Sequence, residues 1–257
     1  MVIFFCPPMM SPFAVDEGLT TLFEEEKACH FHEVTHPDKL HRFRGVAVAI
    51  QKSSILSVEA SLLGNHILER YARRAVNSLS PADVAGCFLI AAKYEDGLIG
   101  TDGDKLASAA HVKVEDMHRS ERVVCVALEF DFCWTNPVHF LRWFSHEADG
   151  WNNATRRVAK AFLLAFTFDS GDLSTSPSLK AAAAMQCAKK VLKSGSWTAY
   201  HVAVTRWDKN EIAKVSAQML KVLQEALLSG NLPFADLLTK GEVAQILCSG
   251  SDRSKGW

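Results

Sequence analysis

The chain has 257 residues, of which 48% are apolar and 22% charged, and its net charge is −1. This composition is too rich in core-forming residues for a disordered protein and is typical of a globular one. The near-neutral charge and the lack of a long basic run argue against a sequence-independent grip on nucleic acid. The longest apolar runs fall short of the roughly 20 residues that span a bilayer. We therefore expect neither nucleic acid nor a membrane as a partner.

The seven cysteines contain no C-x-x-C pair and mostly lie inside apolar helical patterns. Such use fits reduced thiols, which predicts a nuclear or cytoplasmic protein. The opening residues MVIFF are apolar, but they lack a basic flank and stop at Pro7 and Pro8, so they make a poor signal peptide. We expect residues 1–13 to form an arm without regular structure.

Helical patterns follow from residue 16 onward. Residues 16–32 predict a surface helix whose charged face is Glu24 to Lys27, and Pro37 then breaks the pattern. Residues 39–52 predict a second helix. Residues 58–75 predict a third, with these residues on its buried side: Leu62, Leu63, His66, Ile67 and Tyr71.

The next helix has the strongest start signal in the chain. Ser80 is placed to cap it, Pro81 suits the first position, and Asp83 follows three residues after the cap. Residues 84–92 contain no charge, so this helix must be buried on nearly all sides. Three further helices are expected near residues 101, 115–130 and 136–144; in the second of them we place these residues inward: Val123, Val124, Ala127 and Leu128.

The second half of the chain repeats this arrangement. Residues 156–168 and 208–230 predict helices, the latter with a capping box at Asp208–Glu211. Between them, the pattern S-P-x3-A-x6-A-K occurs at Ser176–Lys189 just as it does at Ser80–Lys93, 96 residues earlier. A duplicated helical unit is the simplest account. We predict an all-α fold of two lobes, and we place the last 27 residues in a frayed tail.

Motifs for enzymatic chemistry are missing from the sequence: there is no Walker loop, G-x-G-x-x-G, H-E-x-x-H or G-x-S-x-G. The best metal candidate is the set Cys29, His32 and His36. Pro37 ends that helix and a fourth ligand at standard spacing is absent, so we favour a histidine-rich helix end. We expect no metal, no cofactor and no catalytic activity.

Three serines are candidate phosphorylation sites. Ser11 precedes a proline, as kinases directed by proline require. Ser170 and Ser174 lie in the segment DSGDLS, placed in a predicted loop, which resembles the D-S-G-x-x-S signal read by a ubiquitin ligase. A short polar loop with a glycine turn explains the same residues. Ser80 and Ser176 are better explained as helix caps.

Several of these helices resemble the cyclin box. The segment from Leu89 to Asp96 resembles the cyclin signature ASKYEE, and ERVVCVALEFDF at Glu121–Phe132 resembles the cyclin stretch that ends in L-x-FD-L. Residues 66–71, 139–142 and 177–198 are similar to mitotic A/B-type cyclins. The resemblance covers about residues 40–227. It implies two tandem five-helix cyclin-box lobes preceded by an N-terminal helix: residues 1–37 as arm and helix, 38–134 and 135–230 as the boxes, and 231–257 as the tail.

The resemblance also implies a function and a site. A cyclin is a non-catalytic subunit that binds and activates a Ser/Thr cyclin-dependent kinase, here with Lys93 and Glu121 making the central polar contacts. The surrounding contact would be formed by Tyr94, Glu95, Cys125, Phe130 and Phe132. The residues themselves leave another interpretation open, because Lys93 and Glu121 each suit the dipole of a helix end and could pair with each other.

Two departures from the family pattern limit this inference. The family's substrate-docking patch MRAIL-x-x-W corresponds here to KLHRFRGV at residues 39–46, which lacks the tryptophan. No R-x-x-L destruction box and no K-E-N sequence occurs in the chain. The alternative function is a cyclin-fold scaffold or transcription adaptor, against which the near-neutral charge argues.

Overall fold

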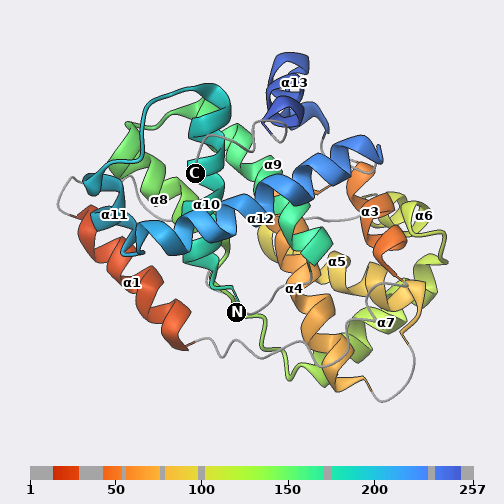
Figure 1. Ribbon diagram of the computed structural model, residues 1–257. Coiled ribbons are helices and arrows are strands. Elements are labelled where there is room, and N and C mark those ends of the chain that lie inside the picture. Colours follow the sequence, from red (N-terminus) through yellow and green to blue (C-terminus); the bar gives the residue numbers. More distant parts are fainter. Residues whose placement is uncertain are drawn as a thin grey trace.

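The computed structural model of the chain describes residues 14–28, 43–53, 56–75, 79–97, 102–170, 175–230 and 235–249. Within these ranges the regular structure is helical and no strand occurs, so the expected all-α class is confirmed (Figure 1). One group of five helices comprises α3 (Arg44–Lys52), α4 (Val58–Arg74), α5 (Pro81–Glu95), α6 (Asp102–Ala109) and α7 (Val114–Ala127). A second group comprises α8 (Pro137–Asp149), α9 (Asn153–Ser170), α10 (Pro177–Leu192), α11 (Ala199–Thr205) and α12 (Lys209–Leu228). Helix α1 (Ala14–Ala28) precedes them, and a 3-10 turn (Ala235–Leu237) and α13 (Lys240–Cys248) follow.

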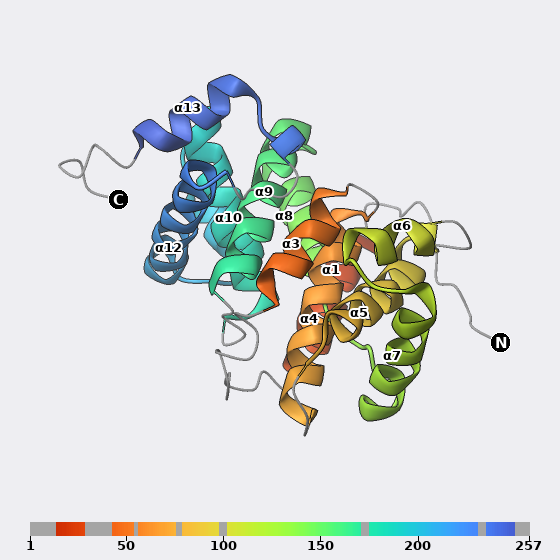
Figure 2. The same cartoon turned by 90° about the vertical axis from the view of Figure 1, so that its right-hand side faces the viewer.

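Helix α5 is the centre of the first group. The Ser80 hydroxyl accepts from Asp83 N (3.2 Å) while the Asp83 carboxylate accepts from Ser80 N (2.8 Å), which completes the predicted cap as a capping box. The uncharged residues 84–92 are all buried. They are covered by α3, α4, α6 and α7, so a helix without a polar face is surrounded by other helices (Figure 2).

Helix α10 is the centre of the second group in the same way. Ser176 caps it by accepting from Leu179 N, Pro177 occupies its first turn, and its alanine-rich body is buried against α8, α9 and α12. The sequence pattern shared by residues 80–93 and 176–189 therefore marks the two central helices of the fold.

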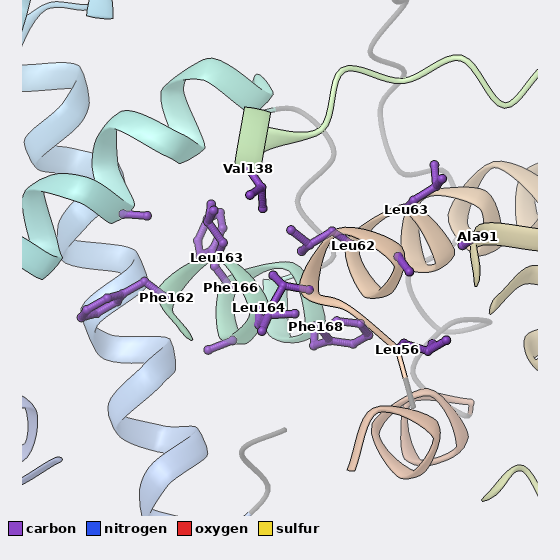
Figure 3. Packing of buried hydrophobic residues seen from close by; sticks show 14 of the residues in the cluster. Leu56, Leu62, Leu63, Ala91, Val138, Phe162, Leu163, Leu164, Phe166 and Phe168 are labelled. Atoms are coloured by element: carbon purple, nitrogen blue, oxygen red, sulfur yellow. The ribbon is translucent and has the colours of Figure 1, made fainter. Parts of the chain in front are cut away.

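The two groups pack against each other through α4 and α9. Leu62 of α4 points toward Leu164 and Phe168 of α9, and all three are buried (Figure 3). At the edge of this contact Glu59 pairs with Lys160 at 2.9 Å. Burial raises the pKa of the Glu59 carboxyl, but the charge and hydrogen bond of Lys160 outweigh it and hold that pKa below its usual value. This pair thus links the two groups electrostatically.

Helix α1 lies on the second group, beside α8 and α10 (Figure 1). Its Phe23 ring packs 5.1 Å from the Phe140 ring. The prediction that Glu26 belongs to a charged, exposed face of this helix is wrong, because Glu26 is buried. Its carboxylate accepts hydrogen bonds from the backbone N and the hydroxyl of Ser178, both at 2.6 Å. Ser178 lies in the first turn of α10, where unpaired N–H groups favour an anion. Burial nevertheless raises the pKa of Glu26.

The C-terminal segment is more ordered than predicted. Helix α13 occupies residues 240–248, which were predicted to lie in a frayed tail. Thr239 and Glu242 form a capping box, Ile246 is fully buried, and Arg157 of α9 holds the Glu242 carboxylate with two hydrogen bonds of 2.9 and 2.5 Å. Isolated short helices are marginal, so these contacts account for the helix. The polar residues from 250 onward lie outside the described part.

His66 of α4 leads to a testable prediction. The His66 ring stacks on Trp134, with ring centroids 4.6 Å apart. Burial, together with the charges of Arg70, Lys180 and Arg73, lowers the pKa of His66 well below its ordinary value of 6.5. The folded state then holds this ring neutral, whereas the unfolded chain takes up a proton, so stability is full above pH 6.5 and falls as the pH falls below it.

We expect urea midpoints of the wild-type chain to decrease between pH 7.5 and pH 5.5. The variant His66→Phe keeps a ring on Trp134 but cannot titrate, so its midpoint should change less over the same range. An identical pH slope in the two proteins would contradict the assignment.

Candidate protein-binding site

The site predicted around Lys93 and Glu121 lies where the end of α5 meets α7. Lys93 stands in the last turn of α5, and its Nζ donates to Glu121 Oε1 at 2.5 Å. The Lys93 side chain is 45% exposed and that of Glu121 16%. The two residues therefore do pair with each other, as one interpretation of the sequence proposed, and they do so at the surface, where another protein can reach them.

A third residue, missed in the sequence analysis, joins this pair. His118 Nδ1 lies 3.1 Å from Glu121 Oε2, so each carboxylate oxygen of Glu121 has a partner within the chain. The i, i+3 spacing of the two residues on one helix was the signal that could have shown it. Glu121 itself lies in the middle of α7, not in its first turn as expected, because the helix begins at Val114.

An exposed aromatic residue follows the end of α7. The helix ends at Ala127, three residues before its predicted end at Phe130. Glu129 (φ 56°) and Phe130 (φ 57°) both adopt left-handed backbone conformations. Phe130 N donates to Cys125 O at 2.9 Å, which closes the turn, while the residue is 69% exposed. Non-glycine residues in this region cost free energy, and an exposed phenylalanine held there is typical of a functional surface.

Two arginines of α4 support this turn. Arg70 donates to the Asp131 carboxylate at 2.7 Å and to its backbone oxygen at 2.9 Å, and Arg74 donates to Ala127 O at 2.8 Å. The Arg70 hydrogen bond lowers the pKa of Asp131, so the carboxylate stays ionised. These bonds fix the position of the exposed Phe130 relative to the helices.

The other predicted contact residues divide into two sets. Tyr94 is 59% exposed, and Cys125 is half-buried close to the charges of Lys93 and Glu121, where burial raises its pKa. Phe132 is also half-buried and packs against the core. Glu95, in contrast, turns toward Asn136 and Glu59 at the junction of the two groups, and burial raises its pKa. Of these residues, Cys125 lies beside the charged pair, and Glu95 is directed toward the junction of the two groups.

One prediction about α7 is wrong. Val123 was placed inward, but it is 49% exposed, and Val126 is 68% exposed. The inward face is formed by Met117, Val124 and Leu128, which are fully buried and recur at helical spacing. A run of neighbouring valines cannot all face one side of a helix, and the α5 contact selects Val124.

The amino-acid sequence is similar to those of known proteins. Residues 135–231 match the family described as Cyclin, C-terminal domain. The G2/mitotic-specific cyclin cig2 of Schizosaccharomyces pombe is 30% identical over 177 residues, which are 67% of this chain and 43% of that protein. The chain belongs to the cyclin family. The G2/mitotic-specific cyclin cdc13 of the same yeast is 26% identical over 228 residues, 83% of this chain and 47% of the relative. This cyclin therefore spans less than half the length of these curated relatives.

A solved structure supports the fold of this cyclin. The viral cyclin from herpesvirus saimiri superposes with a TM-score of 0.68 at 17% identity, and the match covers 81% of this chain and 97% of the viral one. At that identity the likeness shows the fold alone. It agrees with the predicted arrangement of two successive helical groups.

The remaining candidate sites of this cyclin are only partly described. Ser11, Ser174 and the set Cys29, His32 and His36 lie outside the described residues. Ser170 is the last residue of α9 and does not lie in the predicted loop. Within the described ranges, no group of three or more His, Cys, Asp or Glu residues could hold a metal ion, and no helix there is long and apolar enough to cross a membrane.

Proposed function

We propose that this cyclin is a non-catalytic regulatory subunit that binds and activates a Ser/Thr cyclin-dependent kinase in cell-cycle control. The observation that carries the proposal is the Lys93–Glu121 pair at the surface, formed by two helices that also carry or precede exposed aromatic residues, Tyr94 on α5 and Phe130 just after α7. The relatives named G2/mitotic-specific cyclins support the cell-cycle assignment. We also propose box boundaries at residues 38–134 and 135–230.

The proposed mechanism is selective binding. A rigid face made by α5 and α7 binds the active arrangement of the kinase more tightly than the inactive one, and the difference in affinity shifts the kinase toward activity. In the kinase this means an inward position of its C-helix, which completes the Lys–Glu pair needed for phosphoryl transfer. The cyclin contributes no reacting group.

Lys93 and Glu121 would bind backbone groups of the kinase. The ammonium of Lys93 can donate to a carbonyl while it remains near Glu121, and the Glu121 carboxylate can accept from an amide. Hydrogen bonds to charged groups are the stronger ones. The exposed Tyr94 and Phe130 would add apolar contact area, as aromatic residues do at the centres of interfaces.

The first test is kinase activation. The purified chain is mixed with each of a panel of monomeric cyclin-dependent kinases, and phosphorylation of histone is measured. Strong activation of one kinase is the expected result. Stable binding without activation would replace the proposal with the scaffold function, and neither binding nor activation across the panel would overturn it.

A further inference from the structure

The backbones of α5 and α7 come close together at Gly86. A Cβ atom built on this residue would lie 2.8 Å from Glu121 N, 3.1 Å from Ser120 C and 3.3 Å from Glu121 Cα. All three are backbone atoms, which cannot rotate away as the end of a side chain can. Any larger residue here must push the two helices apart, so the spacing between α5 and α7 depends on the missing side chain.

The residue that touches Gly86 through its backbone is the same residue that reaches Lys93 through its carboxylate. Gly86 and Lys93 are seven residues apart, which places them on one face of α5, two turns from each other. The backbone of Glu121 lies against Gly86. The Oε1 atom of the same residue lies 2.5 Å from Lys93 Nζ, two turns further along α5. A displacement of α7 at Gly86 therefore moves the Glu121 carboxylate directly.

We propose that Gly86 is a positioning residue for the Lys93–Glu121 pair: it sets the α5–α7 distance on which the kinase-binding arrangement of that pair depends. The inference rests on the proposed function in so far as it concerns kinase binding. The geometric part of the inference is that Gly86 allows the Lys93 and Glu121 side chains to pair. This part does not depend on whether the chain binds a kinase.

The first experiment compares three glycine-to-alanine variants of the full chain. Gly86→Ala is the test. Gly45→Ala, in α3, is a neutral control because nothing lies within 4 Å of its added Cβ. Gly64→Ala, in α4, is a packing control because its Cβ would meet the Phe88 ring of α5 at 2.5 Å and not the backbone of α7. Alanine is the better helix former, so helix propensity alone predicts no loss in any of them.

We expect Gly86→Ala to weaken binding to the activated kinase by about tenfold, while both controls bind like the wild-type chain. Equal losses in Gly86→Ala and Gly64→Ala would assign the effect to general destabilisation and overturn the inference. The variant Glu121→Asp, which withdraws the carboxylate by one methylene without touching the α5–α7 backbone contact, should lose affinity to a similar extent. Unchanged affinity of Glu121→Asp would also contradict it.

The second experiment needs no kinase. In a crystal structure of Gly86→Ala we expect the distance from Lys93 Nζ to Glu121 Oε1 to exceed 4.0 Å, whereas an intact pair would overturn the inference. If the wild-type chain binds no kinase, the proposed function fails and this distance still decides the geometric part. If Gly86→Ala does not fold, Glu121→Asp decides whether the exact position of the carboxylate matters.

Discussion

Replacement of both Lys93 and Glu121 with alanine is expected to weaken kinase binding by at least about 100-fold, because each lost hydrogen bond to a charged group is worth roughly 1.5–3 kcal/mol. The fold should be unaffected. Lys93 is 45% exposed, and exposed ion pairs contribute at most about 1 kcal/mol to stability. Isothermal titration with the kinase identified by the activation panel, together with urea denaturation, measures both quantities.

The matched control for this variant is a second exposed ion pair. Lys221 and Glu225 of α12 lie 3.8 Å apart with side chains 77% and 58% exposed, on the other group of helices. Their double alanine variant removes the same charges and should bind the kinase normally. Unchanged affinity in a well-folded Lys93→Ala, Glu121→Ala chain would show that the kinase binds elsewhere.

The largest expected effect on stability lies in the second group, at Asp149. Its carboxylate binds the ammonium of Lys189, and its Oδ1 lies 3.3 Å from His201 Nε2. All three side chains are at most 7% exposed. The variant Asp149→Ala leaves the Lys189 charge buried without its partner, which costs about 3–5 kcal/mol. Urea denaturation at pH 7 should show this loss.

A surface aspartate provides the comparison. Asp116 pairs with Arg119 at 3.0 Å, but these side chains are 44% and 70% exposed. Asp116→Ala should therefore change the free energy of unfolding by less than about 1 kcal/mol. If Asp149→Ala were equally mild, the Lys189 ammonium would have to reach water or another partner in the variant.

Much of the fold could be predicted because the signals are local. Ser80 and Ser176 cap their helices, and a run of residues without charge must be buried whatever surrounds it. The predictions that failed depended on contacts between distant segments. Glu26 reads as a surface residue until the start of α10 is placed against it, and residues 240–248 read as a tail until Arg157 meets Glu242.

At the Lys93–Glu121 site, too, local features could be predicted, whereas contacts between distant segments could not. The resemblance to cyclins singled out Lys93 and Glu121, but sequence alone could not decide whether they pair with each other, and it missed His118. Their meeting depends on the α5–α7 approach at Gly86, a contact between residues far apart in the chain. Val123 was misplaced because a row of apolar residues does not say which of them faces the neighbouring helix.

The repeated pattern that ends at Lys93 and at Lys189 shows what the sequence determined and what the tertiary structure determined. The sequence by itself determined that two equivalent helices carry a lysine near their C-terminal ends. Only the tertiary structure decided their different surroundings: Lys93 pairs at the surface, whereas Lys189 is 6% exposed and bound to Asp149. The physical reason is the packing around each helix end. The ends of α8 and α11 enclose the second lysine, whereas the first remains open to solvent and to another protein.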